Sequence, residues 1–350
     1  ASDWSSDVCS SDLLAAMERV QLGNSDIKVS PVCVGRWQFN GGAQSADKTW
    51  NPQPEQVSKD IVDKALEVGI NFFDTAEGYL NSEEVVGRIF QGRRNNVVLA
   101  TKFGARVPIY TGVDIEQSIT NSLQKLQTSY IDLYQVHWPV FVVDFKDCFD
   151  ELNRQKAKGR ILEYGVSNFG NQNLIDAIEA GAKPITNQLS YNLLWRPIEC
   201  EIIPKGAEYQ IDTLAYSPLQ QGLLTDKYCA PEEMPEGRRR GRLFNAKKTS
   251  LCIHEGEGFE KLTFETIAEI KKICNEAEVP MSQAALSWCL QQPTVKCVIV
   301  GASNPDQIAK NAEVVKLQQD VINKLNDATK ELKEALGNNP DMWAKESRIA

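Results

Sequence analysis

Residues 70–79 read INFFDTAEGY, residues 97–102 read VVLATK, and residues 131–139 read IDLYQVHWP. In each stretch an apolar run rich in β-branched residues ends at polar side chains. Such runs are typical of parallel strands, which are covered on both faces and need no alternation of polar residues. In a parallel barrel the carboxyl ends of all strands open on one rim. The polar residues of these three stretches are therefore expected to meet there.

The same pattern recurs along the chain. Eight apolar runs are expected to be strands, at about 32–37, 70–74, 97–102, 131–136, 161–166, 184–188, 211–216 and 296–300. Most of them precede a segment whose apolar residues have helical spacing, such as 54–69, 114–127, 144–159 and 171–181. Eight such units in series predict an α/β fold, a closed (β/α)8 TIM barrel.

Three further segments do not belong to this repeat. Residues 17–30 alternate polar and apolar side chains around Gly23, which predicts an N-terminal β-hairpin. Residues 320–337 are expected to form an extra C-terminal helix. The long irregular stretch from about 220 to 258 follows the seventh strand and is expected on the rim.

No Pro- or Ser-rich linker divides the series. We therefore expect a single barrel domain over residues 17–337 and a C-terminal tail at 338–350. Residues 1–16 contain three Asp, no Lys or Arg, and little apolar content. They lack the basic start and apolar centre of a secretory signal and are interpreted as a foreign or artefactual extension.

Composition excludes several classes of function. The formal net charge of −9 disfavours nucleic-acid and anionic-membrane partners. Nine cysteines without a CxxC pair indicate reduced thiols in the cytoplasm, and two histidines make a zinc site improbable, so no metal is expected. No apolar stretch approaches the roughly 18 residues of a membrane-spanning helix.

Asp74, Tyr79, Lys102 and His137 together suit proton donation to a carbonyl group. A phenol has an unperturbed pKa near 10, and a neighbouring ammonium is expected to bring the pKa of Tyr79 down. Asp74 would balance the charge of Lys102, and a neutral His137 would orient the carbonyl oxygen. No side chain supplies hydride, so carbonyl reduction implies a nicotinamide cofactor.

Each of these residues also has an ordinary structural explanation when it is taken alone. Asp74 could be a turn or N-cap residue, and Tyr79 a half-buried amphipathic side chain. Lys102 could be a solvated strand end, and His137 a structural histidine. Their common position at strand ends favours a site, because the rim rule brings such groups together.

These residues fall, in order, on the catalytic tetrad of the aldo-keto reductases, a family that the chain resembles from about Val20 to Gln318. The strings FDTAEGY, ATK and VHWP carry the tetrad, and GVSNF, NQLSYN, AYSPL and GASNPDQIAKN agree further along the chain. The resemblance implies the (β/α)8 barrel, a nicotinamide cofactor and reduction of aldehydes or ketones. Some of the motifs are similar to the potassium-channel β-subunit branch.

The resemblance also implies a set of cofactor residues besides Asp74. Those expected at the nicotinamide are Trp37, Ser167, Asn168, Gln188 and Tyr216. Those expected at the pyrophosphate are Ser217, Pro218, Leu219, Gly222 and Lys227. Those expected around the adenosine and its 2′-phosphate are Gly301, Ser303, Gln307 and Asn311. From the residues alone, Ser303 could be a plain helix cap, Gly222 a turn glycine, and Tyr216 or Trp37 a core aromatic.

The sequence thus predicts a cytoplasmic NADPH-dependent oxidoreductase that acts on a small carbonyl substrate. A regulatory nicotinamide-binding redox sensor and a dehydrogenase working in the oxidative direction stay open as alternatives. Aromatic side chains are expected on the pocket wall, namely Tyr110, Trp138, Trp195 and Trp343. The arginines from Arg238 to Arg242 could close over cofactor phosphates or form a solvated patch. The preferred substrate and the oligomeric state are not readable from the sequence.

Overall fold

The computed structural model describes residues 17–350 except 37, 40, 43–52, 105–110 and 143. The extension expected at 1–16 lies outside the described residues.

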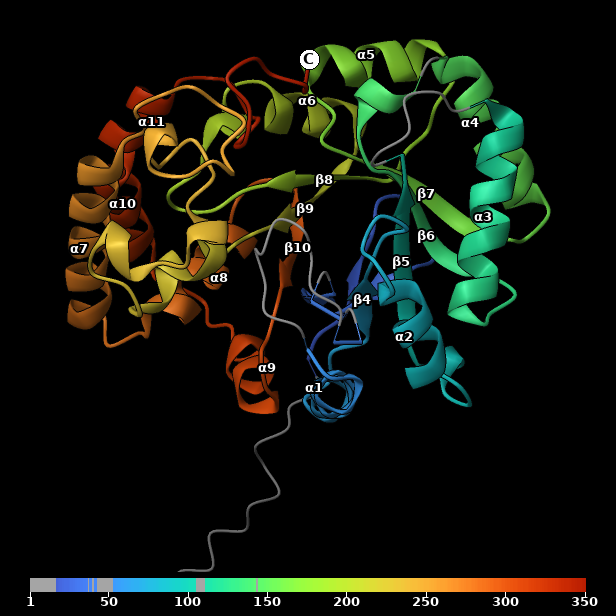
Figure 1. Cartoon of the computed structure of the whole chain (residues 1–350), viewed down its shortest axis with the longest axis horizontal. Coiled ribbons are helices and arrows are strands. Elements are labelled where there is room, and N and C mark those ends of the chain that lie inside the picture. Colours follow the sequence, from blue (N-terminus) through green and yellow to red (C-terminus); the bar gives the residue numbers. More distant parts are fainter. Residues whose placement is uncertain (1–16, 37, 40, 43–52, 105–110, 143) are drawn as a thin grey trace, which may run out of the picture.

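Eight parallel strands close into a barrel in the order β10-β3-β4-β5-β6-β7-β8-β9 (Figure 1). Their bounds are β3 Val32–Gly35, β4 Phe72–Asp74, β5 Val98–Phe103, β6 Ile131–Val136, β7 Ile161–Ser167, β8 Thr186–Ser190, β9 Asp212–Tyr216 and β10 Val295–Val300. Every expected strand is present, with ends displaced by two residues at most. The predicted (β/α)8 barrel is confirmed. Buried apolar runs of this length suit parallel strands, which are covered on both faces.

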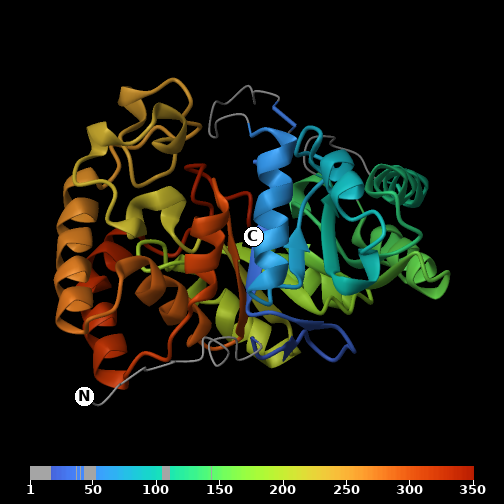
Figure 2. The same cartoon turned by 90° about the horizontal axis from the view of Figure 1, so that it is seen from below.

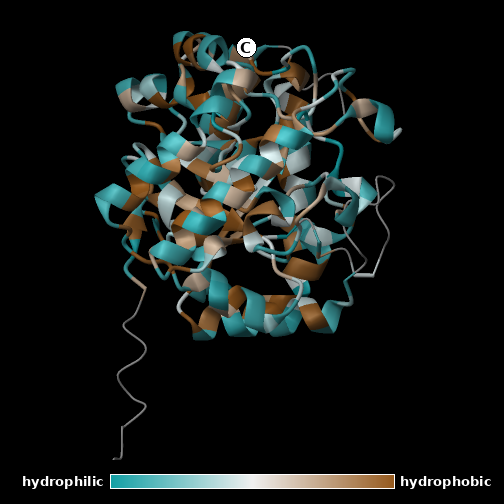
Figure 3. Ribbon diagram, turned by 90° about the vertical axis from the view of Figure 1, so that its left-hand side faces the viewer, coloured by the Kyte–Doolittle hydropathy of each residue, from teal (hydrophilic) through white to brown (hydrophobic). Residues whose placement is uncertain are grey.

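Helices surround the barrel. Their bounds are α1 Glu55–Glu67, α2 Ser82–Ile89, α3 Gly112–Leu126, α4 Phe145–Ala157, α5 Asn171–Glu179, α6 Ile202–Tyr209, α7 Glu260–Glu276, α8 Met281–Leu290, α9 Pro305–Ala312, α10 Gln319–Ala328 and α11 Lys330–Leu336. Along the outer helices apolar and polar residues alternate (Figure 3), as expected of amphipathic helices. The Asp144 and Asn304 side chains cap the starts of α4 and α9.

The N-terminal hairpin covers the amino end of the barrel (Figure 2). It consists of β1 Val20–Gln21 and β2 Lys28–Val29, paired antiparallel as predicted. Leu22 and Val29 pack into the apolar filling of the barrel, and the Gly23 N–H donates to Asp212, the first residue of β9. Since one end is closed in this way, the carboxyl-end rim is the open face.

The segment after β9 winds through short 3-10 turns at Gln220–Thr225, Pro231–Glu233, Glu236–Arg238 and Ala246–Lys248. The helix expected at 320–337 is divided into α10 and α11 at Thr329. The Thr329 hydroxyl donates to the Leu325 carbonyl (2.9 Å) and accepts from Arg196 Nη1 (2.7 Å), which ties the break to the body of the protein.

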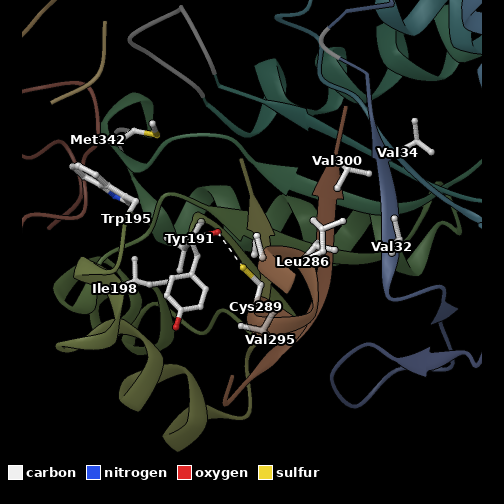
Figure 4. Packing of buried hydrophobic residues seen from close by; sticks show 14 of the residues in the cluster. Val32, Val34, Tyr191, Trp195, Ile198, Leu286, Cys289, Val295, Val300 and Met342 are labelled. Atoms are coloured by element: carbon white, nitrogen blue, oxygen red, sulfur yellow. Dashed lines mark hydrogen bonds between the residues drawn. The ribbon is translucent and has the colours of Figure 1, made fainter. Parts of the chain in front are cut away.

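The tail beyond α11 has no helix or strand among its described residues, yet it is packed against the barrel. Met342 lies in the main apolar core with Trp195 (Figure 4), and the Ser190 hydroxyl donates to its sulfur (3.0 Å). No helix in the described part of the chain is both long and apolar enough to span a membrane.

Candidate active site

The four expected catalytic residues come from three adjacent strands at the open rim. Asp74 is the last residue of β4, Lys102 is the penultimate residue of β5, and His137 follows β6 directly. Strands β4, β5 and β6 are hydrogen-bonded neighbours, which places their carboxyl ends side by side. Tyr79 lies in the turn between β4 and α2.

Asp74 and Lys102 form a buried ion pair. The Lys102 ammonium donates to Asp74 Oδ1 at 2.5 Å and to the Thr75 carbonyl at 2.8 Å. Asp74 Oδ2 accepts from the side-chain amides of Gln135 (3.2 Å) and Gln188 (3.1 Å). Burial opposes the charge of Lys102, but the Asp74 carboxylate and the Tyr79 phenol outweigh it, so the pKa of Lys102 is raised. The ammonium therefore stays charged.

Tyr79 faces this ammonium. Lys102 Nζ lies 5.1 Å from the centroid of the Tyr79 ring and acts on the phenol by charge and hydrogen bonding. Burial nevertheless raises the pKa of Tyr79, since desolvation of the phenolate outweighs the favourable charge of Lys102. The expected lowering of this pKa is thus not seen, and the phenol keeps its proton more firmly than a free tyrosine does.

His137 completes the group on the other side of the phenol. The rings of Tyr79 and His137 are 5.7 Å apart and meet edge to face at 81°. The His137 backbone N–H donates to the Phe103 carbonyl (2.7 Å), and the Asn168 amide donates to the His137 carbonyl (3.0 Å). The backbone of His137 is therefore fixed between β5 and the end of β7, and its ring lies beside the phenol.

A cavity of about 980 Å³ opens at this rim, large enough for a cofactor and a small substrate. Tyr79, His137 and Asp74 line it, whereas Lys102 lies behind them and is fully buried. All the expected cofactor residues except Trp37 also line this cavity. Trp37 lies outside the described residues.

Polar side chains meet in the part of the cavity next to Asp74. The Ser167 hydroxyl donates to the Gln188 carbonyl (2.9 Å), and the Tyr216 hydroxyl donates to Asn168 Oδ1 (2.9 Å). Asn168 has a φ of 60°, a left-handed conformation that asparagine tolerates better than most residues. These amide and hydroxyl groups have the donors and acceptors that a nicotinamide carboxamide requires.

The turn after β9 is tightly wound. Ser217, Gln220, Gln221 and Gly222 all have positive φ, and the N–H groups of Gln220 and Gly222 donate within the turn to the carbonyls of Ser217 (2.8 Å) and Leu219 (2.9 Å). A side chain at Gly222 would meet the Tyr228 ring at 3.3 Å and Arg238 Nη1 at 4.0 Å. Since cations adjoin this close-packed turn, it fits a pyrophosphate.

The start of α9 forms a further part of the wall. Ser303 N–H donates to the Gln307 side chain (2.8 Å), and Gln307 N–H donates to Asn304 Oδ1 (2.9 Å). Lys310, one turn further along α9, also lines the cavity. Both N–H groups are thus used within this turn, and the Lys310 ammonium is the charged group that this part of the wall offers to a phosphate.

Some residues of the site were not found from the sequence. Gln135, which holds Asp74, is a polar residue inside an apolar strand, and that exception was a usable signal. Arg348 lines the cavity from a tail without periodicity. Of the expected aromatic wall, Trp138 and Trp343 are present, and Tyr110 lies outside the described residues. Trp195 is not part of this wall: it is fully buried in the core, where its indole donates to the Pro340 carbonyl (3.3 Å).

Comparison with known proteins gives a family match. The sequence profile described as "Aldo/keto reductase family" matches residues 31–330, which is most of the chain. Members of that family use a nicotinamide cofactor.

Several relatives cover nearly the whole chain. The chain is 28% identical to the "NADH-specific methylglyoxal reductase" of Escherichia coli, over 86% of this chain and 94% of that protein. It is 30% identical to the "Putative voltage-gated potassium channel subunit beta" of Schizosaccharomyces pombe, over 87% and 91%. The glycerol dehydrogenase of Gluconobacter oxydans superposes with a TM-score of 0.73 at 25% identity, over 90% and 96%.

Proposed function

The chain belongs to the aldo/keto reductase family, and we propose that it is an NADPH-dependent oxidoreductase that reduces aldehydes or ketones to alcohols. One observation carries the proposal. The Tyr79 phenol lies beside both the Lys102 ammonium and the His137 ring, on the wall of a cavity that is large enough for cofactor and substrate together.

The substrate carbonyl oxygen would accept hydrogen bonds from Tyr79 and His137, which orients it and stabilises developing negative charge. A nicotinamide held by the polar residues beside Asp74 would supply hydride to the carbonyl carbon. Tyr79 then protonates the resulting alkoxide. Although the pKa of Tyr79 is raised by burial, a phenol is still far more acidic than water, whose pKa is about 15.7 and resembles that of an alcohol.

Lys102 stabilises the phenolate that this transfer leaves behind. Asp74 keeps the ammonium in place, and Gln135 and Gln188 in turn keep the carboxylate in place through its second oxygen. The group has no nucleophile paired with a base, so covalent hydrolysis is poorly served.

The preference for NADPH is supported by the cations at the phosphate end of the cavity. Lys227, Arg238 and Lys310 line that end, and an additional phosphate gains from each of them. Measuring the KM for NADPH and for NADH with one aldehyde tests the preference. An equal or lower KM for NADH would contradict it.

The activity is tested by Tyr79→Phe. Removal of the phenol hydroxyl should lower kcat by at least 10²-fold, as expected for the loss of a general acid, while leaving the Kd for NADPH within about twofold. Consumption of NADPH with a panel of aromatic aldehydes, aliphatic aldehydes and sugars gives the rates, and fluorescence titration gives the Kd. Tyr209→Phe, on α6 away from the cavity, is the matched control. A variant at position 79 that works at the parent rate would refute the assignment.

Two relatives give the alternatives a specific basis. One is named a potassium channel subunit and another a glycerol dehydrogenase. A sensor would transfer a single hydride without reaching a steady state, and an oxidative enzyme would work faster with NADP⁺ and an alcohol. Comparing a single-turnover experiment with steady-state rates in both directions separates the three.

A further inference from the structure

We propose that Arg348, assisted by Arg240, forms a carboxylate-binding subsite, so that the preferred substrates are carbonyl compounds that also carry a carboxylate. This inference rests on the proposed function and adds the substrate class. Both arginines line the cavity. Arg240 comes from the long segment after β9, and Arg348 comes from the tail.

Both guanidinium groups are placed over tryptophan rings of the same wall. The central carbon of Arg348 lies 4.2 Å from the centroid of Trp138, and that of Arg240 lies 4.8 Å from the centroid of Trp343. Such contacts are favourable and restrict the position of the planar guanidinium. The two arginines are therefore set in place before any substrate arrives.

Asp341 holds Arg348 from behind. Arg348 Nε donates to Asp341 Oδ2 at 2.7 Å, and Nη2 donates to Oδ1 at 2.9 Å. Asp341 has no exposed surface and also accepts the backbone N–H groups of Trp343 and Ala344. Arg348 Nη1 donates to no partner in the part of the chain that the structure describes. One edge of the guanidinium is thus anchored, and the other is available to a planar anion.

This edge lies near the reacting groups. Trp138, under Arg348, directly follows His137, whose imidazole would hold the carbonyl oxygen. Tyr79, Tyr216 and Arg348 all line the same cavity. A substrate whose carbonyl reaches Tyr79 therefore needs only a short or aromatic spacer to reach Arg348.

The charge of the cavity supports an anion. The chain carries a net charge of −9, yet the described residues that line the cavity include more cations than anions. The cations are Arg36, Lys227, Arg238, Arg240, Lys310 and Arg348, and the anions are Asp74 and Glu313. The cofactor phosphates account for Lys227, Arg238 and Lys310. At the substrate end the guanidinium groups of Arg240 and Arg348 would both attract a carboxylate, and Asp341 offsets part of the charge of Arg348.

The test uses two aldehydes of nearly equal shape, 4-carboxybenzaldehyde and its neutral methyl ester, with NADPH at saturation. The parent protein should have a kcat/KM at least tenfold higher for the acid. Arg348→Met should lower kcat/KM for the acid about 10- to 100-fold, equivalent to about 1.4 to 2.8 kcal/mol, mainly through KM. Its kcat/KM for the ester should stay within about twofold. Arg240→Met should show a smaller loss of the same kind.

Controls separate recognition from folding. Lys247→Met removes an exposed cation from the same segment, where Lys247 pairs with Glu257 (3.2 Å) and does not line the cavity, and it should change neither rate. Arg348→Lys keeps a charge beside Asp341 but loses the planar fork, so it should fold and still lose part of the acid preference. The retained rate with the ester shows in each variant that the site is intact.

A parent protein without preference for the acid, or an Arg348→Met variant that loses both substrates equally, overturns the subsite while the reductase assignment stands. If neither aldehyde is reduced with NADPH or NADH, the proposed function fails and the subsite with it.

Discussion

The two sides of the barrel rim are built by different means. On one side Asp74, Lys102 and His137 stand at the ends of β4, β5 and β6, where the sheet hydrogen bonds set the position of each backbone. On the other side Trp343 and Arg348 are held by a tail without regular structure. The chemistry is on the first side, and the contacts that would select a substrate are on the second.

The second side depends on individual side chains. Arg242 donates to the carbonyls of Asn339 (3.0 Å) and Leu336 (3.3 Å), and its backbone N–H donates to Met342 (2.9 Å). Glu199 accepts from Lys333 of α11 at 2.7 Å. None of the residues in these contacts belongs to a barrel strand. Loss of a strand-end group should therefore abolish catalysis, whereas loss of a tail contact should lower the stability of the fold and the selectivity for substrates.

Lys102→Met should give the largest effect. It removes the cation that stabilises the phenolate of Tyr79, and kcat should fall about 10²- to 10³-fold, or about 2.7 to 4 kcal/mol in the barrier. Steady-state rates with one reactive aldehyde measure it. Lys296→Met, at the exposed amino end of β10, is the matched control and should keep the parent rate. A loss below tenfold would show that the ammonium contributes little to the chemistry.

Asp341→Ala should affect the other side of the rim. The buried carboxylate holds Arg348 and three backbone N–H groups, so its loss should lower the free energy of unfolding by about 2–4 kcal/mol. The released tail should also be cut faster by trypsin after Lys345 and Arg348. Thermal unfolding and mass spectrometry of the digest measure the two effects. Asp327→Ala, exposed on α10, is the control, and equal digestion of both variants would mean that Asp341 does not hold the tail.

The pH dependence of the reaction rate should be set by the strand-end side of the rim, where Tyr79 donates the proton. Because burial raises the pKa of Tyr79, the phenol retains its proton to higher pH than a free tyrosine, for which the value is about 10. The rate of carbonyl reduction at saturating substrate should therefore be nearly constant between about pH 6 and 9. The oxidative direction needs the phenolate and should instead accelerate as pH rises. A reductive rate that falls tenfold between pH 7 and 9 would show that the folded protein does not keep Tyr79 protonated.

The same contrast explains what the sequence could and could not predict. Strand ends follow from apolar runs, so the sequence located Asp74, Lys102 and His137 on one rim. Periodicity says nothing about a tail that is fixed by contacts such as Asp341 with Arg348. Trp343 was expected on the wall as an aromatic residue, but Arg348 was missed. Trp195 was misplaced for a related reason, since composition does not tell a wall tryptophan from a core one. The pKa of Tyr79 was predicted in the wrong direction, because the cost of burial depends on neighbours that only the fold assembles.

Arg36, on the strand-end side of the rim, contributes a backbone hydrogen bond and a buried side-chain charge, and these two contributions can be tested separately. Its backbone N–H donates to the Asp74 carbonyl (3.0 Å), which joins β3 to β4 directly behind the site. Its side chain is fully buried, without a hydrogen-bond partner among the described residues, and lies 4.3 Å from the Phe73 ring centroid and 4.6 Å from that of Phe90. Burial lowers the pKa of Arg36 to about 9. The side chain therefore works chiefly as apolar volume, with a charge that is costly to bury.

Arg36→Met should keep that volume and remove the buried charge. Desolvation of an ion costs several kcal/mol, and contacts with aromatic rings return about 2 kcal/mol each at best, so the two contributions nearly cancel. The free energy of unfolding should change by less than about 1 kcal/mol, or rise, and kcat should stay within about threefold. Arg36→Ala should instead lose about 2–4 kcal/mol, because it leaves a cavity behind β4. Denaturant titration of both variants decides the matter: if Met is as damaging as Ala, the charge of Arg36 is needed, and the strand-end side also depends on an individual side chain.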